Sequence, residues 1–184
     1  YDLNSHSFKY VPMGSSRVRG DQKAEEDTLI HVYGELGIAN DYRIMSSDRV
    51  LHNYSIMMIG NGYSLEGVQI GFLNFLKEDA QGAQISPIFN MIGGKNTGTQ
   101  LAGIFNISRG SMAYQGAGIF NISDDSTKGA QTAGIFNISS GNLNGVQASG
   151  IFNITTGEMK GFQGSGIFNI AEKQGKGSQF AGIF

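Results

Sequence analysis

The sequence predicts an all-β protein, a β-solenoid of about eight 16-residue coils that follows an N-terminal β cap. Three observations lead to this fold class. The 184-residue chain contains 28 glycines but two prolines, and 15% of its residues are charged. A ten-residue motif, G-x-Q-x-[AS]-G-I-F-N-I, recurs along the last two thirds of the chain. From residue 67 onward, every charged residue lies in the spacers of five or six residues that separate the motifs. A unit this short is below the roughly 33 residues of a helical-hairpin repeat, and its glycines disfavour helix.

The N-terminal part, residues 1–66, contains no copy of the motif and is interpreted as the β cap. Its β-branched and aromatic residues predict strands over residues 7–13, 28–39 and 53–59. Residues 14–27 are predicted to form a loop. This part also holds all three histidines of the chain and a net charge of -3, from six basic and nine acidic residues.

The second part, residues 67–184, is predicted to be the repeat array. Its units are centred on eight glutamines that follow one another at intervals of 15 or 16 residues: Gln69, Gln84, Gln100, Gln115, Gln131, Gln147, Gln163 and Gln179. The first copy lacks one residue between its Gln and its Asn, and the second has Pro87 in place of a glycine. Atypical units are expected where an array begins, because a terminal unit has a different neighbour.

Each unit is predicted to form two short strands, one around the Gln and one over I-F-N-I, bent at the glycine between them. Successive units then stack at about 4.8 Å, so that like side chains lie over one another. We expect the phenylalanines to form the apolar core and the Asn and Gln amides to form structural hydrogen-bonded ladders. The residues of these columns are Phe89, Phe105, Phe120, Phe136, Phe152 and Phe168, with Asn90, Asn106, Asn121, Asn137, Asn153 and Asn169, and with Gln100, Gln115, Gln131, Gln147 and Gln163.

An up-and-down transmembrane β-barrel is the alternative fold, because its strands also run about 9–11 residues between turns. Consecutive strands of such a barrel run in opposite directions, and the turns on its two sides usually differ in length. Here the phase of the motif never alternates and every spacer has nearly the same length. The repeat therefore indicates that successive units are related by a shift along one axis without reversal of strand direction, which favours the solenoid.

No catalytic, cofactor-binding or metal-binding signature is found in the sequence. The chain has no cysteine, and His6, His31 and His52 show no metal-ligand spacing. The repeats contain no histidine, which excludes a Ser-His-Asp triad within them. The formal charge of -2 gives no electrostatic basis for binding nucleic acid. The sequence therefore predicts a protein that is not an enzyme and needs no cofactor; a hydrolase acting through the N-terminal histidines is a weaker hypothesis.

The unit G-x-Q-x-x-G-[IL]-F-N-[IV], preceded by the predicted strand YSIMMIGNG over residues 54–62, resembles the surface repeat-containing proteins of bacteria with two membranes. The resemblance covers residues 54–184. It implies an exported protein of the cell surface or outer membrane, with no enzymatic activity assigned to the repeats. The shortened first motif and Pro87 depart from the family pattern.

These observations together predict a structural or interaction protein of the bacterial envelope. The final motif reaches Phe184 without its Asn, so an open strand edge is expected at that end. We expect a protein partner, or self-association, through this end or through the turns. The alternative function, which accompanies the alternative fold, is an outer-membrane β-barrel or pore component.

Overall fold

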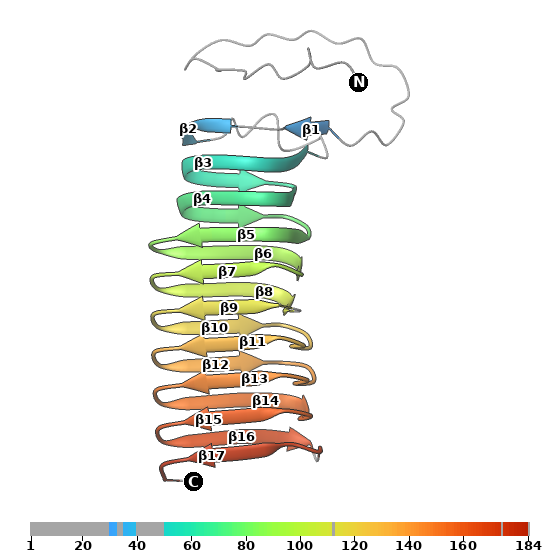
Figure 1. The fold of residues 1–184 in the computed structure, drawn as a ribbon, viewed down its shortest axis with the longest axis vertical. Helices are drawn as coiled ribbons and strands as arrows, with labels where there is room; N and C mark the ends of the chain where they lie inside the picture. Colours follow the sequence, from blue (N-terminus) through green and yellow to red (C-terminus); the bar gives the residue numbers. More distant parts are fainter. Residues whose placement is uncertain (1–29, 33–34, 40–49, 112, 174, 184) are drawn as a thin grey trace, which may run out of the picture.

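The described part of the chain forms one stack of strands that runs from the N-terminal side to the C-terminal side as a rod (Figure 1). The structure is a computed structural model, and it describes residues 30–32, 35–39, 50–111, 113–173 and 175–183. The predicted strand at residues 7–13 and the predicted loop at residues 14–27 lie outside these residues. Seventeen strands and no helix occur in the described part, so the predicted all-β solenoid is confirmed.

From β5 onward the strands belong alternately to two parallel sheets, because each strand pairs with the second strand after it. One sheet carries the repeat glutamines and is called here the Gln sheet: β5 (Ala80–Ser86), β7 (Thr99–Ala102), β9 (Tyr114–Ala117), β11 (Ala130–Ala133), β13 (Val146–Ser149), β15 (Phe162–Ser165) and β17 (Ser178–Ala181). The other carries the repeat asparagines and is called the Asn sheet: β6 (Phe89–Asn96), β8 (Phe105–Ser111), β10 (Phe120–Ser123), β12 (Phe136–Ser139), β14 (Phe152–Glu158) and β16 (Phe168–Lys173).

Four strands precede this alternation. β3 (Val50–Gly62) and β4 (Ser64–Leu76) are long strands that pair with each other in parallel, and β4 then pairs with both β5 and β6. β1 (Ile30–Val32) and β2 (Glu35–Ala39) pair with the two halves of β3. The parallel stacking therefore reaches back to residue 30, and the boundary between residues 66 and 67 falls inside β4.

The register repeats the sequence motif without a shift along the middle of the array. Asn121 pairs with Asn106 on one side and with Asn137 on the other, while Gln131 pairs with Gln115 and Gln147. All strand pairings of the described residues are parallel. An up-and-down barrel would instead pair each strand antiparallel with the next one along the chain, and this alternative is therefore wrong.

From the third unit onward, the bend between the two sheets lies at the predicted glycine and the isoleucine after it, as at Gly134 and Ile135; Pro87 and Ile88 form the bend of the second unit. Successive bend glycines lie so close that a Cβ atom added to Gly134 would collide with the carbonyl oxygen of Gly118. Glycine is thus required at the bend because backbone lies directly over backbone. At the start of the array a second requirement appears, since Gly67 and Gly82 have φ angles of 136° and 139°.

The interior of the rod is polar, and the expectation of a phenylalanine core is wrong. Within β12, Asn137 and Ser139 are fully buried, whereas Phe136 and Ile138 are only half-buried and point outward. The alternation of a strand sends residues i and i+2 to one face, so Phe and Ile must share the face opposite to Asn and Ser. The repeat glutamines from Gln69 to Gln163 are likewise buried. The amides that were expected to form ladders are the interior of the protein.

Among the described residues, the buried apolar side chains other than Met57 of β3 lie on the spacer side of the interior. Leu143 is fully buried, and it pairs through isolated bridges with Thr127 and Met159 of the neighbouring spacers. Near the start of the array, an apolar cluster occupies this side: Leu65, Leu76, Ala80 and Ile92. The sequence predicted solvated turns, but three successive spacers also contribute a buried side chain to the end of the coil: Thr127, Leu143 and Met159.

Candidate functional site

The asparagine column forms a continuous hydrogen-bonded ladder along the Asn sheet. The side-chain amide of Asn121 donates to the Oδ1 atom of Asn137 at 2.8 Å, and Asn137 donates to Asn153 at 2.9 Å. The same Nδ2 atom of Asn137 also donates to the carbonyl oxygen of Ala148 at 2.8 Å, in the Gln sheet of the next coil. Each asparagine therefore ties the two sheets together across the bend, in addition to linking successive coils.

The glutamine column forms a second ladder whose hydrogen bonds run in the opposite direction. Gln131 donates to the Oε1 atom of Gln115 at 2.7 Å, and Gln147 donates to Gln131 at 2.7 Å. Glutamine amides thus donate toward the N-terminal coil and asparagine amides toward the C-terminal coil. Both predicted ladders are present. Because their hydrogen bonds run in opposite directions, the amide dipoles of the two rows also point in opposite directions.

Both ladders end at the coil formed by β3, where Ser55 takes the glutamine position and Gly60 takes the asparagine position. Three buried atoms have no hydrogen-bond partner there: the Oγ of Ser55, the Nε2 of Gln69 and the Oδ1 of Asn74. A Cβ atom on Gly60 would lie 2.7 Å from both amides, so a side chain at this position would crowd them. The buried Asn and Gln amides of the array are therefore bonded to one another, except at this first rung; the Oγ of Ser123 in β10 also has no partner.

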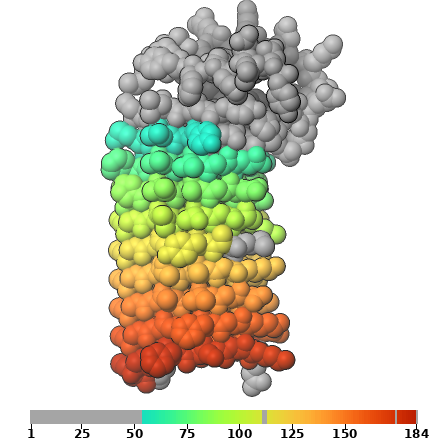
Figure 2. Space-filling view, in the orientation of Figure 1, coloured from blue at the N-terminus to red at the C-terminus, as the bar shows by residue number. Residues whose placement is uncertain are grey.

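The phenylalanine column lies outside, on the face of the Asn sheet, as a stack of nearly parallel rings. Consecutive rings from Phe89 to Phe168 have centroids 4.9–5.0 Å apart and planes within 6° of each other. Beside it runs a column of Met91 and isoleucines, from Ile107 to Ile170. The side chains of successive coils lie in rows along the surface, one row for each coil (Figure 2).

Uncharged columns also cover the bend and the outer face of the Gln sheet. The bend carries exposed isoleucines, among them Ile135 and Ile151, each with 36% of its surface accessible. Two outer columns of the Gln sheet run from Tyr54 to Ser178 and from Ile56 to Phe180, and they hold aliphatic, aromatic and small residues. We call the two sheet faces and the bend together the outer wall. Among the described residues from 54 onward, its charged side chains lie only at or near the strand ends next to the spacers, as Glu66 of β4, Arg109 of β8 and Glu158 of β14 do.

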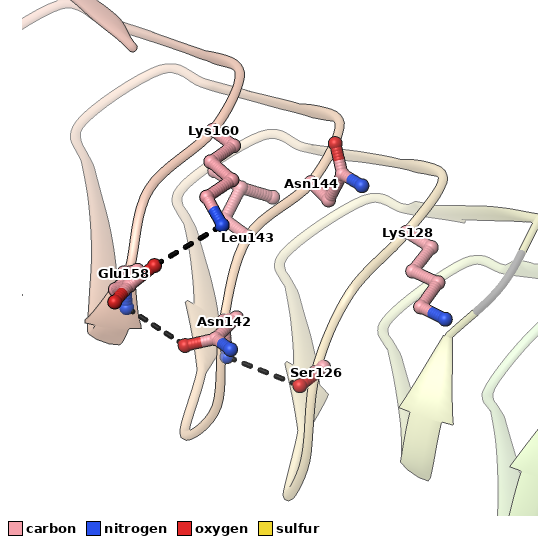
Figure 3. Close-up of a pocket in the computed structure, with 7 residues that line it drawn as sticks. All are labelled: Ser126, Lys128, Asn142, Leu143, Asn144, Glu158 and Lys160. Atoms are coloured by element: carbon pink, nitrogen blue, oxygen red, sulfur yellow. Dashed lines mark hydrogen bonds and ion pairs between the residues drawn. The ribbon is translucent and has the colours of Figure 1, made fainter. Parts of the chain in front are cut away.

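The fourth side of the rod, the spacer edge, carries the charges. All thirteen charged residues of the array, from Lys77 to Lys176, are exposed there, as the sequence predicted. The spacers also stack on one another. The backbone amide of Glu158 donates to Oδ1 of Asn142 at 2.8 Å, and the amide of Asn142 donates to Oγ of Ser126 at 3.2 Å (Figure 3).

A shallow hollow with a volume of about 130 Å³ lies on this edge (Figure 3). An ion pair of 3.2 Å between Lys160 and Glu158 borders it, and both side chains are about half exposed. Its lining is Ser126, Lys128, Asn142, Leu143, Asn144, Glu158 and Lys160. Neither the size of this hollow nor its solvated charges are typical of a catalytic site.

The histidines that motivated the hydrolase hypothesis are only partly described. His31 lies in β1 and His52 in β3, on paired strands, while His6 lies outside the described residues. Among the residues that the structure describes, no group of three His, Cys, Asp or Glu side chains could hold a metal ion. In the same part of the chain there is no helix with the length and hydrophobicity to cross a membrane.

Comparison with known proteins returned no matching family model, no matching curated protein and no matching solved structure.

Proposed function

We propose that this protein is a non-enzymatic scaffold of the bacterial cell envelope, a stacked β-repeat rod that docks to a partner. The observation that carries the proposal is the outer wall, a largely apolar surface that continues over both sheet faces and the bend and is charged only next to the spacers. Exposed apolar patches of this extent are typical of surfaces that another molecule covers.

The interior of the rod supports a structural role for the repeated polar residues. The asparagine and glutamine amides bond to one another and to backbone carbonyls, so they are not directed toward a ligand. The groups left for external contact are the outer wall and the charged spacers. In the part of the chain that the structure describes, neither brings together a nucleophile, a base and a group that orients the base, which is the arrangement that nucleophilic catalysis needs.

The location rests on the resemblance of the repeat to bacterial surface proteins, which implies export to the envelope. A rod whose coils are locked by two ladders is also suited to hold a surface at a fixed distance, because each coil adds one strand spacing of about 4.8 Å.

Cell fractionation with site-specific cross-linking tests this proposal. The full-length protein, produced in its own cells, carries a photo-reactive phenylalanine analogue either at Phe136 on the outer wall or at Asn144 on the spacer edge. We expect the protein in the envelope fraction and cross-links from at least one of these positions. Recovery in the soluble cytoplasmic fraction, or an envelope protein with no cross-link from either position, would overturn the proposal.

A further inference from the structure

We propose that the partner of the outer wall is a lipid bilayer, into one leaflet of which the rod inserts with its axis in the plane of the membrane. This inference rests on the envelope role proposed above and names the surface that the scaffold binds. In this orientation the bend isoleucines point toward the middle of the bilayer and the charged spacer edge stays among the headgroups.

The distribution of charge supports this orientation. Among the described residues from 54 onward, charged side chains lie in the spacers or at the strand ends that adjoin them, such as Arg109 of β8 and Glu172 of β16, and the bend and the sheet faces beside it carry none. A structure that is polar along one edge and uncharged on the remaining sides is amphipathic about its long axis, as interfacial membrane elements are.

The interior satisfies the main requirement for burial in hydrocarbon, which is that polar groups find partners within the protein. The repeat Asn and Gln side chains are turned inward, and each central asparagine donates both to its neighbour and to a backbone carbonyl. In the described coils from β5 onward, the Oγ of Ser123 is the one buried side-chain polar atom without a partner. The parallel sheets pair the backbone from coil to coil. Contact between the outer wall and lipid therefore leaves the hydrogen bonds of the central coils unchanged.

The dimensions of the coil fit one leaflet. Ala130, at the start of a Gln-sheet strand, is five residues from the bend isoleucine Ile135, a span of about 16 Å at the rise of a β-strand. Half of a typical hydrocarbon core is about 15 Å. The uncharged part of the coil thus spans one leaflet while the spacers remain in the interface.

A second copy of the chain fits the outer wall less well. One sheet face measures about 13 Å by 38 Å, from four strand residues and nine rungs, or roughly 500 Å². A stable protein interface covers about 800 Å² on each partner. Flat packing of two sheets also leaves the bend and the opposite face uncovered, whereas lipid chains surround all three sides together.

Flotation with vesicles of neutral phosphatidylcholine tests the inference on the complete 184-residue protein. We expect it to float with the vesicles, and to remain bound at about 1 M salt, where the screening length is about 3 Å. Insensitivity to salt is expected because the array is nearly neutral, with seven basic and six acidic residues. Failure to float, or release by salt, would overturn lipid insertion.

Matched variants test which side inserts. The pair Ile135→Glu and Ile151→Glu places two charges on the bend and should weaken flotation at least tenfold. The control pair, Ser140→Glu and Asn144→Glu, adds the same charge at exposed spacer positions and should float like the unmodified protein. Equal effects of the two pairs would overturn the proposed orientation.

Tryptophan quenching gives a second measurement that does not depend on the charged variants. The protein has no tryptophan, so Ile135→Trp and Asn144→Trp each provide a single fluorophore. Lipids brominated on their acyl chains should quench the fluorophore at position 135 and not the one at position 144.

Light scattering without lipid separates the remaining outcomes. A defined dimer that does not float, and that Ile135→Glu dissociates, would replace the bilayer with a second copy. A protein that resides in the envelope of cells but does not bind vesicles would overturn lipid insertion while leaving the scaffold role intact.

Discussion

Replacing Asn137 with alanine should destabilise the fold more than replacing the adjacent Phe136, although the phenylalanine is the larger apolar side chain. The amide of Asn137 donates at 2.9 Å to Asn153 and at 2.8 Å to the carbonyl oxygen of Ala148. Its removal takes the donor from both acceptors inside the rod. Each buried polar group left without a partner costs about 1–3 kcal/mol, so the free energy of unfolding should fall by about 4 kcal/mol.

The expected cost of Phe136→Ala is lower because the ring is on the outside. It stacks between Phe120 and Phe152, at 4.9 Å from each centroid, and is half-buried. Truncation of a fully buried phenylalanine costs about 3–5 kcal/mol, and the partly exposed Phe136 should cost less, about 2–3 kcal/mol. This value replaces the larger one that a phenylalanine core would give.

Urea unfolding of the two variants and the unmodified protein, followed by far-ultraviolet circular dichroism, measures the difference. The comparison requires similar slopes for all three proteins, because a changed slope signals a change in cooperativity. A loss for Phe136→Ala that equals or exceeds the loss for Asn137→Ala would refute the assignment of the amides to the interior.

Three further predictions concern the same coils. Asn137→Asp places a carboxyl inside the ladder, where burial raises its pKa; the variant should be more stable near pH 4 than at pH 7, and unfolding at the two pH values measures this difference. Gly134→Ala should cost about 2–3 kcal/mol in urea unfolding because its Cβ meets backbone, whereas Gly110→Ala, whose closest neighbour would lie at 3.5 Å, should be neutral or slightly stabilising. Tyr114→Phe removes a hydroxyl 2.6 Å from that of Thr132 and should cost about 1 kcal/mol, a loss that should be absent in a Thr132→Val background.

The repeat made the fold predictable. Because the motif recurs every 15 or 16 residues in the same orientation, successive units can stack with their strands parallel. The pairing of Asn121 with Asn106 and Asn137 follows directly from this repeat. The two amide columns were predictable for the same reason, since identical amides at one strand spacing bond along the column.

Hydrophobicity did not predict which residues fill the interior. The alternation of side chains along a strand shows which residues share a face, but it does not show which of the two faces is buried. Phe136 and Ile138 alternate with Asn137 and Ser139, and either pair satisfies the pattern. Comparison of the columns gives the missing signal. The outer position of the Gln sheet varies among Thr99, Tyr114 and Phe162, which no close-packed interior would tolerate, while the glutamine beside it never changes.

The opposed directions of the amide ladders have a consequence for the length of the rod. In a single row of aligned amides the dipoles add, so the total dipole grows with every rung and the two ends of the row carry opposite partial charges. Here the first rung leaves a donor on Gln69 beside an acceptor on Asn74, so the tip is electrically balanced. Adding or removing whole units changes both rows equally and leaves the partial charges at the first rung unchanged. The rod can therefore differ in its number of coils without a change in the residues of that rung.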